Sequence, residues 1–300
     1  MDTYMTVTKN ARHRALATMT VAATLFGAMA FTAKIASERI SGTEVAMIRM
    51  MVGLLPCIFI ARYRRAAIDF HRFDLLLYRG IFGGIAVMLY FLAIEHTTAG
   101  IATLLQYTSP VWSGLFSMLF IGERFSARVV LPLIVAFAGI ILVLHADALG
   151  FGIWEIAGLC GGAASGAAVT AMRAARRAEN SWSVYASFCF FGMLVNAPLA
   201  IHSWKTPAGS EWIAIGATSL FAMGAQLLLT FSLRWVDAMT VGVISQLAVL
   251  ISMALGALFL AEQMTVLTGV GAALTILGVV GVTYVTSLGR VAADEVVADA

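Results

Sequence analysis

Uncharged polar residues recur at helical spacing within one long apolar stretch, residues 98–121. Steps of three and four residues place them on one face of a helix. The stripe consists of Thr103, Gln106, Tyr107, Pro110, Gly114 and Ser117. Amides, hydroxyls and phenols of this kind can hydrogen-bond a polar solute without carrying a charge, so the stripe favours solute binding over bond-breaking chemistry.

A second stripe of the same kind lies within residues 238–260. Its members are Gly242, Ser245, Gln246, Val249, Met253 and Gly256, with Ser252 beside them. Gln106 and Tyr107 of the first stripe correspond in position to Ser245 and Gln246 of the second. Hydrogen bonding between packed helices could explain either stripe alone. The correspondence between the two favours a shared, water-accessible cavity that binds substrate.

Residues in other apolar stretches could complete such a cavity. Tyr90 and Gln226 could supply further polar groups, while Phe82, Met29 and Trp112 could form an apolar wall, although such side chains more often serve packing or lipid contact. Pro110 cannot donate a backbone hydrogen bond near the middle of its stretch, so we expect a hinge there.

Two arginines fall inside apolar stretches, where an unpaired charge is costly. Arg49 lies about a third of the way in, with Glu44, Glu38 and Glu95 toward the same face. It could form an outer-gate ion pair, contact a substrate carboxylate, or anchor the structure. Arg79 lies near the end of its stretch, and we expect its side chain to extend to the cytoplasmic surface.

Composition identifies the solvent that surrounds these residues. The 300 residues are 61% hydrophobic and only 12% charged, which excludes an ordinary soluble globule. We predict an all-α integral membrane protein with ten transmembrane helices, at approximately 15–33, 44–61, 75–94, 98–121, 127–145, 153–172, 182–201, 211–231, 238–260 and 266–286. A cleavable signal peptide ending near Ala28-Met29-Ala30 is the weaker interpretation of the first stretch.

The chain repeats itself at an offset of 139 residues without a gap. Gly27 matches Gly166, Gly53 matches Gly192, Glu123 matches Glu262, Ser126 matches Thr265 and Gly139 matches Gly278. The predicted domains are therefore a first repeat over 15–146 and a second over 152–286, with cytoplasmic tails at 1–14 and 287–300. Five spans in each repeat make the second inverted relative to the first, around a central cavity suited to alternating access.

Charge placement gives an orientation and argues against several functions. Of 19 Lys and Arg residues, 14 fall on the side that carries both termini, which predicts cytoplasmic termini. The centres of the predicted spans contain neither Asp nor Glu, so the usual carboxylate for proton coupling is missing. The chain has no HExxH, GxSxG or paired-Asp motif, so we predict no enzyme activity, no metal and no cofactor. A nucleic-acid partner is not expected either.

These features together resemble the drug/metabolite transporter superfamily, in particular its ten-helix members with two EamA-type halves. The resemblance rests on Arg49, on Ser109-Pro110, on the turn Gly122-Glu123-Arg124-Phe125-Ser126 and on its echo at 261–265. Val249 replaces the second proline, so the second half must bend by other means. Ten helices can enclose a cavity within one chain, which leaves the oligomeric state open.

The resemblance implies a transporter of the bacterial inner membrane that exports neutral, aromatic or varied amino acids and related metabolites. Its expected partners are the small-molecule substrate and membrane lipid. Uptake or exchange of a nucleoside-like metabolite such as S-adenosylmethionine is the alternative substrate class. A channel or lipid flippase is a further class, and a membrane-embedded enzyme is the least supported.

Because no coupling carboxylate is predicted, we expect transport to be driven by the gradient of the substrate itself. Proteoliposomes containing the protein should exchange labelled substrate without an imposed proton gradient, and an ionophore should leave the initial rate unchanged. Transport that requires the gradient and stops when the ionophore is added would contradict this expectation.

Overall fold

The computed structural model describes residues 2–63, 71–121, 127–146, 152–175, 179–232 and 238–298, and in these ranges the regular structure is helical. The helices are α1 (Asp2–Ala36), α2 (Gly42–Tyr63), α3 (Phe73–His96), α4 (Ala99–Gln106), α5 (Ser109–Ile121), the 3₁₀ turn η2 (Ala127–Val129), α6 (Val130–Ala146), α7 (Ile153–Ala175), α8 (Ser181–His202), α9 (Gly209–Ser232), α10 (Ala238–Ser245), α11 (Leu247–Phe259) and α12 (Val266–Ala298).

Each predicted span corresponds to a helix or to a pair of helices. Within the described ranges, seven helical segments are long and apolar enough to cross a membrane, and Val130–Leu144 is a shorter apolar helix. The predicted spans 98–121 and 238–260 are each divided into two helices. Both predicted tails are helical where described, because α1 and α12 extend through them. Side chains such as Leu55, Leu258 and Val266 are exposed on the outside, as a lipid-facing surface requires.

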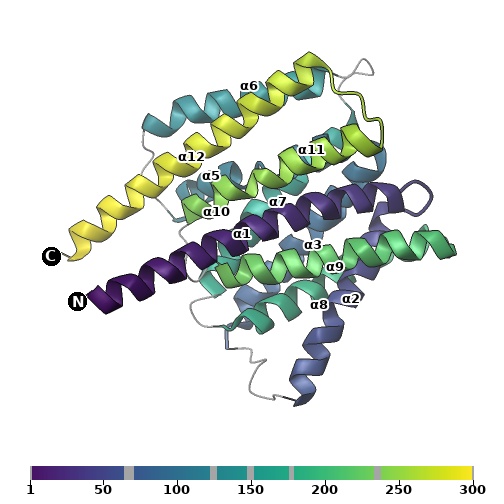
Figure 1. Cartoon of the computed structure of the whole chain (residues 1–300), viewed down its shortest axis with the longest axis horizontal. Helices are drawn as coiled ribbons and strands as arrows, with labels where there is room; N and C mark the ends of the chain where they lie inside the picture. The colour runs from purple at the N-terminus through teal and green to yellow at the C-terminus, as the bar shows by residue number, and fades with distance from the viewer. Residues whose placement is uncertain are drawn as a thin grey trace.

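The two chain ends lie at the same end of the bundle (Figure 1). We call this the termini end; α3 and α8 also begin there. The opposite end, which we call the far end, contains the turns 37–41, 97–98, 203–208 and 260–265. Helices α6 and α12 lie side by side along one edge of the bundle, and α2 and α8 lie along the opposite edge (Figure 1).

Helix packing repeats between the two halves of the chain. α1 packs against α9 and α11, and its counterpart α7 packs against α3 and α5, the counterparts of α9 and α11. The pairs α2 with α8 and α6 with α12 are each formed by two counterparts. This pattern is expected when an internal two-fold relation connects two inverted repeats.

Glycines at matching positions permit these close approaches. A Cβ atom at Gly27 would lie 2.7 Å from Ile251 of α11, and one at its mate Gly166 would lie 2.8 Å from Trp112 of α5. Gly139 and Gly278 are also mates, and they occupy the contact between α6 and α12. The added Cβ atoms would lie 2.5 Å from Thr275 Oγ1 and 2.6 Å from the Ala136 side chain, respectively.

The symmetry fails where the two divided helices meet. At the far end α4 packs against α11. The corresponding pair at the termini end is α5 and α10, and these two helices are not among the closely packed pairs in the part of the chain that the structure describes. Instead, α5 packs on α7 and α10 packs on α12. Among the described residues, the two divided helices are therefore packed more closely at the far end than at the termini end.

Close packing at Gly278 makes a stability prediction. Gly278→Ala should lower the free energy of unfolding by about 1–3 kcal/mol, because its methyl group would overlap Ala136. Thermal unfolding of the purified protein measures the change. Gly269→Ala on the same helix is the matched control, because nothing lies within 4 Å of a Cβ there and alanine favours helix. Equal effects of the two variants would contradict the proposed tight contact.

Candidate substrate site

The first divided helix breaks at Tyr107 and Thr108. The Tyr107 amide donates to Thr103 O at 2.9 Å, but the Thr108 amide donates to Leu105 O, three residues back. Pro110 has no N–H to offer the Gln106 carbonyl and its ring would clash with that carbonyl in a regular helix. The break therefore occurs within the turn that precedes Pro110, where the sequence predicts a hinge.

The second divided helix breaks at Gln246, the position that matches Tyr107. Here the Gln246 amide donates to Val243 O rather than to Gly242 O, so the helix tightens locally without a proline. Side-chain Nε2 of Gln246 lies 3.4 Å from Gly242 O and donates to the carbonyl that the backbone leaves unpaired. The side-chain amide thus provides the alternative means of bending that Val249 made necessary.

A hydrogen bond joins the two breaks. Gln246 Nε2 also donates to the Tyr107 carbonyl at 3.3 Å, so two residues related by the repeat contact each other near the centre of the bundle. The Tyr107 ring packs edge-on against Phe26 of α1, with 6.4 Å between ring centroids. The Tyr107 hydroxyl has no hydrogen bond to any described residue, and it is therefore available to a solute.

Three further polar side chains connect α3, α4 and α11 beside the breaks. Thr103 Oγ1 lies 2.9 Å from Tyr90 Oη and 3.1 Å from Ser252 Oγ. All three residues are buried. We call Tyr90, Thr103, Tyr107, Gln246 and Ser252 the break cluster. It uses polar groups from both halves of the chain, and its contacts include the hydrogen bonding between helices that the sequence left as an alternative.

The other polar candidates lie away from these contacts. Gln106 faces α7, where Gly161 leaves room for its side chain, and its buried Oε1 has no hydrogen-bond partner. Ser245 donates at 2.6 Å to Val241 O of its own helix. Gln226 is buried in α9, and its side-chain amide has no hydrogen bond to a described residue. Gln106 and Gln226 thus have unused hydrogen-bonding capacity, and Ser245 does not need a solute.

The apolar candidates are not brought together. Met29 is buried in the hydrophobic core beside Tyr90 and Ala222. Trp112 donates at 3.1 Å to Thr108 Oγ1 and packs at right angles on Phe137 of α6. Phe82 is 36% exposed and stacks on Tyr78, which is also exposed. Met29 and Trp112 therefore have packing positions and Phe82 has a surface position, and the three do not form a common wall.

The structure narrows the prediction for Arg49 and corrects the prediction for Arg79. Arg49 is buried, and among the described residues it forms no ion pair with Glu44, Glu38 or Glu95; its guanidinium lies over the Phe91 ring instead. Arg79 does not reach the cytoplasmic surface. Its guanidinium lies over Phe188, because Gly83 of the next helical turn leaves space for it. Gly83, four residues after Arg79, was the feature of the sequence that indicated this direction of the side chain.

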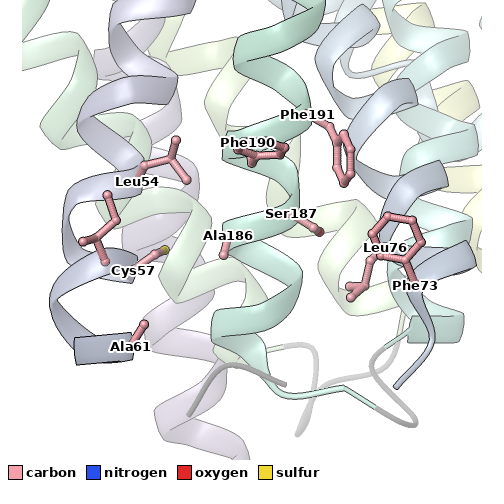
Figure 2. Close-up of a pocket in the computed structure, with 10 residues that line it drawn as sticks. Leu54, Cys57, Ala61, Phe73, Leu76, Ala186, Ser187, Phe190 and Phe191 are labelled. Carbon is pink, nitrogen blue, oxygen red and sulfur yellow. The ribbon is translucent and has the colours of Figure 1, made fainter. Parts of the chain in front are cut away.

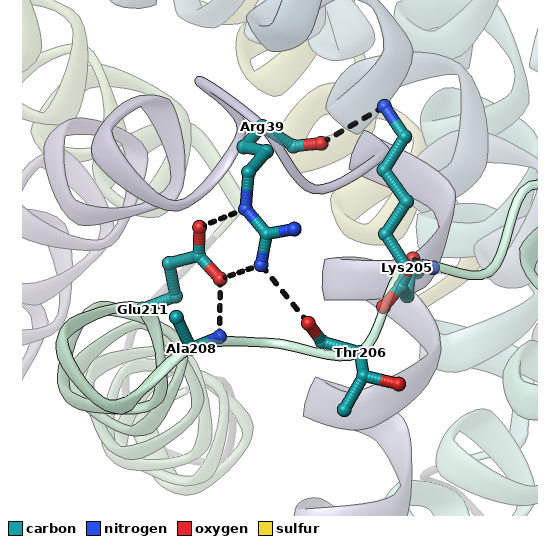
Figure 3. Close-up of polar contacts among 6 residues, drawn as sticks. Arg39, Lys205, Thr206, Ala208 and Glu211 are labelled. Carbon is teal, nitrogen blue, oxygen red and sulfur yellow. Dashed lines mark hydrogen bonds and ion pairs between the residues drawn. The ribbon is translucent and has the colours of Figure 1, made fainter.

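A group of ionic and polar contacts fastens the far end (Figure 3). Arg39 donates to both carboxylate oxygens of Glu211 at 2.5 Å and to Thr206 O at 2.9 Å. The Ala208 amide donates to Glu211, and Lys205 Nζ donates to Arg39 O. We call these five residues the far-end clasp. The clasp joins the turn between α1 and α2 to the turn between α8 and α9. The hydrogen bond that Arg39 donates to Glu211 raises the pKa of Arg39.

Three further polar contacts lie at the far end, and one of them joins the two halves of the chain. Glu262 lies just before α12, but its Oε1 accepts from the Ala99 amide at 2.8 Å and caps α4 of the other repeat. Thr265 caps α12, accepting from the Thr268 amide at 3.1 Å. Lys34 Nζ donates to Ile94 O at 2.9 Å and so supports the end of α3. Glu123 and Ser126, the repeat mates of Glu262 and Thr265, lie outside the described residues.

A separate apolar pocket of about 380 Å³ lies among α2, α3 and α8 (Figure 2). Its lining includes Leu54, Cys57, Phe73, Phe190 and Phe191, with Ser187 as a polar member. None of the sequence-predicted site residues lines it. Its apolar lining suits a hydrocarbon chain rather than a polar solute.

One polar residue at this helix junction was missed by the sequence argument. Asn196 of α8 is fully buried, and its Nδ2 donates to Gly192 O at 2.8 Å and to Gly84 O of α3 at 3.4 Å. A single asparagine inside an apolar stretch was the available signal. Its contacts indicate a structural tie between α8 and α3.

Loss of the clasp should open the far end. In a variant whose native cysteines are serine, Thr43→Cys places a thiol at a buried far-end position. Adding Arg39→Gln should raise its maleimide labelling rate about two- to fivefold, as expected for the loss of one exposed ion pair. Arg72→Gln, which removes the Arg72–Asp74 ion pair at the termini end, is the control and should leave the rate unchanged. No difference between the variants would show that the clasp does not hold this end closed.

Comparison with known proteins agrees with the two-repeat architecture. The profile of the EamA-like transporter family matches residues 13–145 and again residues 152–284. The pseudopaline exporter CntI of Pseudomonas aeruginosa is 27% identical over 256 residues, which cover 84% of this chain and 89% of the exporter. An uncharacterized transporter of Helicobacter pylori is 22% identical over 69% of this chain and 73% of its own length.

A solved crystal structure supports the same fold. It matches with a TM-score of 0.64 at 22% sequence identity, over 93% of this chain and 98% of the other. Solute carrier family 35 member G1 of Mus musculus is 27% identical over a shorter region, 36% of this chain and 30% of its own length. With both halves matched by the family profile, this chain belongs to the EamA-like transporter family, within the drug/metabolite transporter superfamily.

Proposed function

We propose that the protein exports amino acids and related small metabolites across the bacterial inner membrane by alternating access. The observation that carries the proposal is the pair of helix breaks at Tyr107 and Gln246, joined by a hydrogen bond. Interrupted helices expose backbone and side-chain polar groups at membrane depth, where solutes can be bound. The relative named as a pseudopaline exporter supports export of a metabolite.

The two ends of the bundle support alternating access. α4 and α11 are packed together at the far end, while among the described residues α5 and α10 are less closely packed at the termini end. In the mirrored state, the second pair would pack and the first would separate. If the termini are cytoplasmic, as the distribution of Lys and Arg predicts, the structure corresponds to an inward-facing state.

Counterflow in proteoliposomes tests the proposal. Vesicles loaded with one unlabelled amino acid or nucleoside at a time should accumulate labelled amino acid in exchange, and the effective solutes define the substrate class. Exchange confined to nucleosides would favour the alternative substrate class. Ion currents or lipid scrambling without any solute exchange would contradict the transporter proposal.

Two variants test the break cluster. Gln246→Ala removes the hydrogen bonds to Gly242 O and Tyr107 O, and we expect it to reduce counterflow about tenfold, the effect of about 1.4 kcal/mol. Tyr107→Phe should raise the half-saturation concentration while leaving thermal stability unchanged, because the removed hydroxyl contacts no described partner.

Gly216→Ala serves as the control for both variants, because a Cβ at Gly216 would meet nothing within 4 Å. It should transport as the unmodified protein does. Normal transport by both Gln246→Ala and Tyr107→Phe would exclude the break cluster as the substrate site.

A further inference from the structure

Two positive charges lie within the bundle without negative partners. Arg49 of α2 is 6% exposed and Arg79 of α3 is 5% exposed. Neither guanidinium forms an ion pair or a hydrogen bond with a described residue, and Arg79 Nε is a buried donor with no acceptor. An unpaired buried charge is expensive, so its presence in an apolar bundle calls for a ligand or a pathway.

The described carboxylates on the adjacent elements are engaged elsewhere. Glu44 accepts from the Lys205 amide, and Glu95 accepts from the Gly42 amide at 2.7 Å. Glu211 pairs with Arg39, Asp74 pairs with Arg72, and Glu262 caps α4. These contacts tie the acidic groups to the two ends of the bundle and leave both arginines without an internal counterion.

The two arginines converge on one side of α8. Arg79 lies 4.2 Å from the Phe188 ring centroid. One helical turn after Arg49, Gly53 faces α8, where a Cβ would lie 2.7 Å from Tyr185 Oη and 2.8 Å from Cys189 Sγ. Gly53 of α2 and the Arg79 guanidinium of α3 therefore lie against the same stretch of α8, residues 185–189. Aromatic faces partly offset each charge but cannot neutralise it.

We propose that Arg49 and Arg79 form an anion subsite that binds the carboxylates of a dianionic substrate. We call the two residues the arginine pair. The inference rests on the proposed transport function and narrows its substrates to acidic amino acids and other dicarboxylates. A planar guanidinium matches a carboxylate through two parallel hydrogen bonds, and two such groups match two carboxylates. Tyr185 and Tyr90 provide phenol groups beside the arginine pair.

Anion binding predicts a specific response of thermal stability. In detergent, with ionic strength held constant by NaCl, glutarate should raise the unfolding midpoint of the full chain by about 5 °C near saturation. Glutaramide has the same shape without charge and should have no effect. Equal stabilisation by phosphate would overturn the carboxylate assignment, and equal effects of glutarate and glutaramide would overturn the anion subsite.

Substitutions identify the residues that cause the glutarate-induced shift of the unfolding midpoint. Arg49→Gln and Arg79→Gln should each abolish the glutarate shift, and the unliganded midpoint should stay the same or rise because an unpaired charge is removed. Arg62→Gln, at an exposed position on the same helix as Arg49, should keep the full shift. If a glutamine variant fails to fold, Arg49→Lys and Arg79→Lys keep the charge and should weaken the shift. A full shift in either Arg79 variant would overturn the proposal.

The outcomes also separate this inference from the proposed function. A protein that exchanges neutral amino acids but does not respond to glutarate would retain the transport function and lose the anion subsite. A protein that binds glutarate through the arginine pair but exchanges no solute would retain the subsite and lose the transport function.

Discussion

The hydrogen bond from Gln246 to the Tyr107 carbonyl is the interaction around which the rest of the bundle is arranged. A helix cannot stop in the middle of a membrane unless other donors and acceptors satisfy its free backbone groups. Here each break lies beside the other, and one side-chain amide serves both chain segments. The two repeats therefore contact each other at the two breaks. The polar side chains of the break cluster lie together there.

The two repeats reach the same geometry by different chemistry. In the first, Pro110 removes a donor and forces the preceding turn open. In the second, Val249 stands at the matching position, and Gln246 satisfies Gly242 O with its side chain. The two helices therefore break at matching positions, although different residues cause the two breaks. This explains why the position of both breaks follows from the repeat, although only one of them follows from a proline.

The sequence predicts features that depend on periodicity, and misses those that depend on side-chain direction. Helical segments, the repeat and the glycine contacts follow from spacing, because lipid imposes regular apolar lengths. The direction of the Arg79 side chain was not predicted correctly. Its position near the end of an apolar stretch suggested that it extends to the surface, but Gly83 leaves space for it to turn toward Phe188. Glu262 is another such case, because capping a helix of the other repeat depends on tertiary contact that local spacing does not encode.

The distribution of charge also fits a bundle that must change shape. The far-end clasp consists of an ion pair in which Arg39 is half exposed, and such contacts contribute about 1 kcal/mol or less. A closure of this strength can be reversed by modest differences in substrate affinity between two states. Buried Glu44, Arg49 and Arg79 form no ion pairs with one another, so no strong internal ion pair among these three residues locks one conformation. In the proposed alternating-access cycle, weak polar closure at the far end and polar breaks at the centre would keep the two states close in free energy.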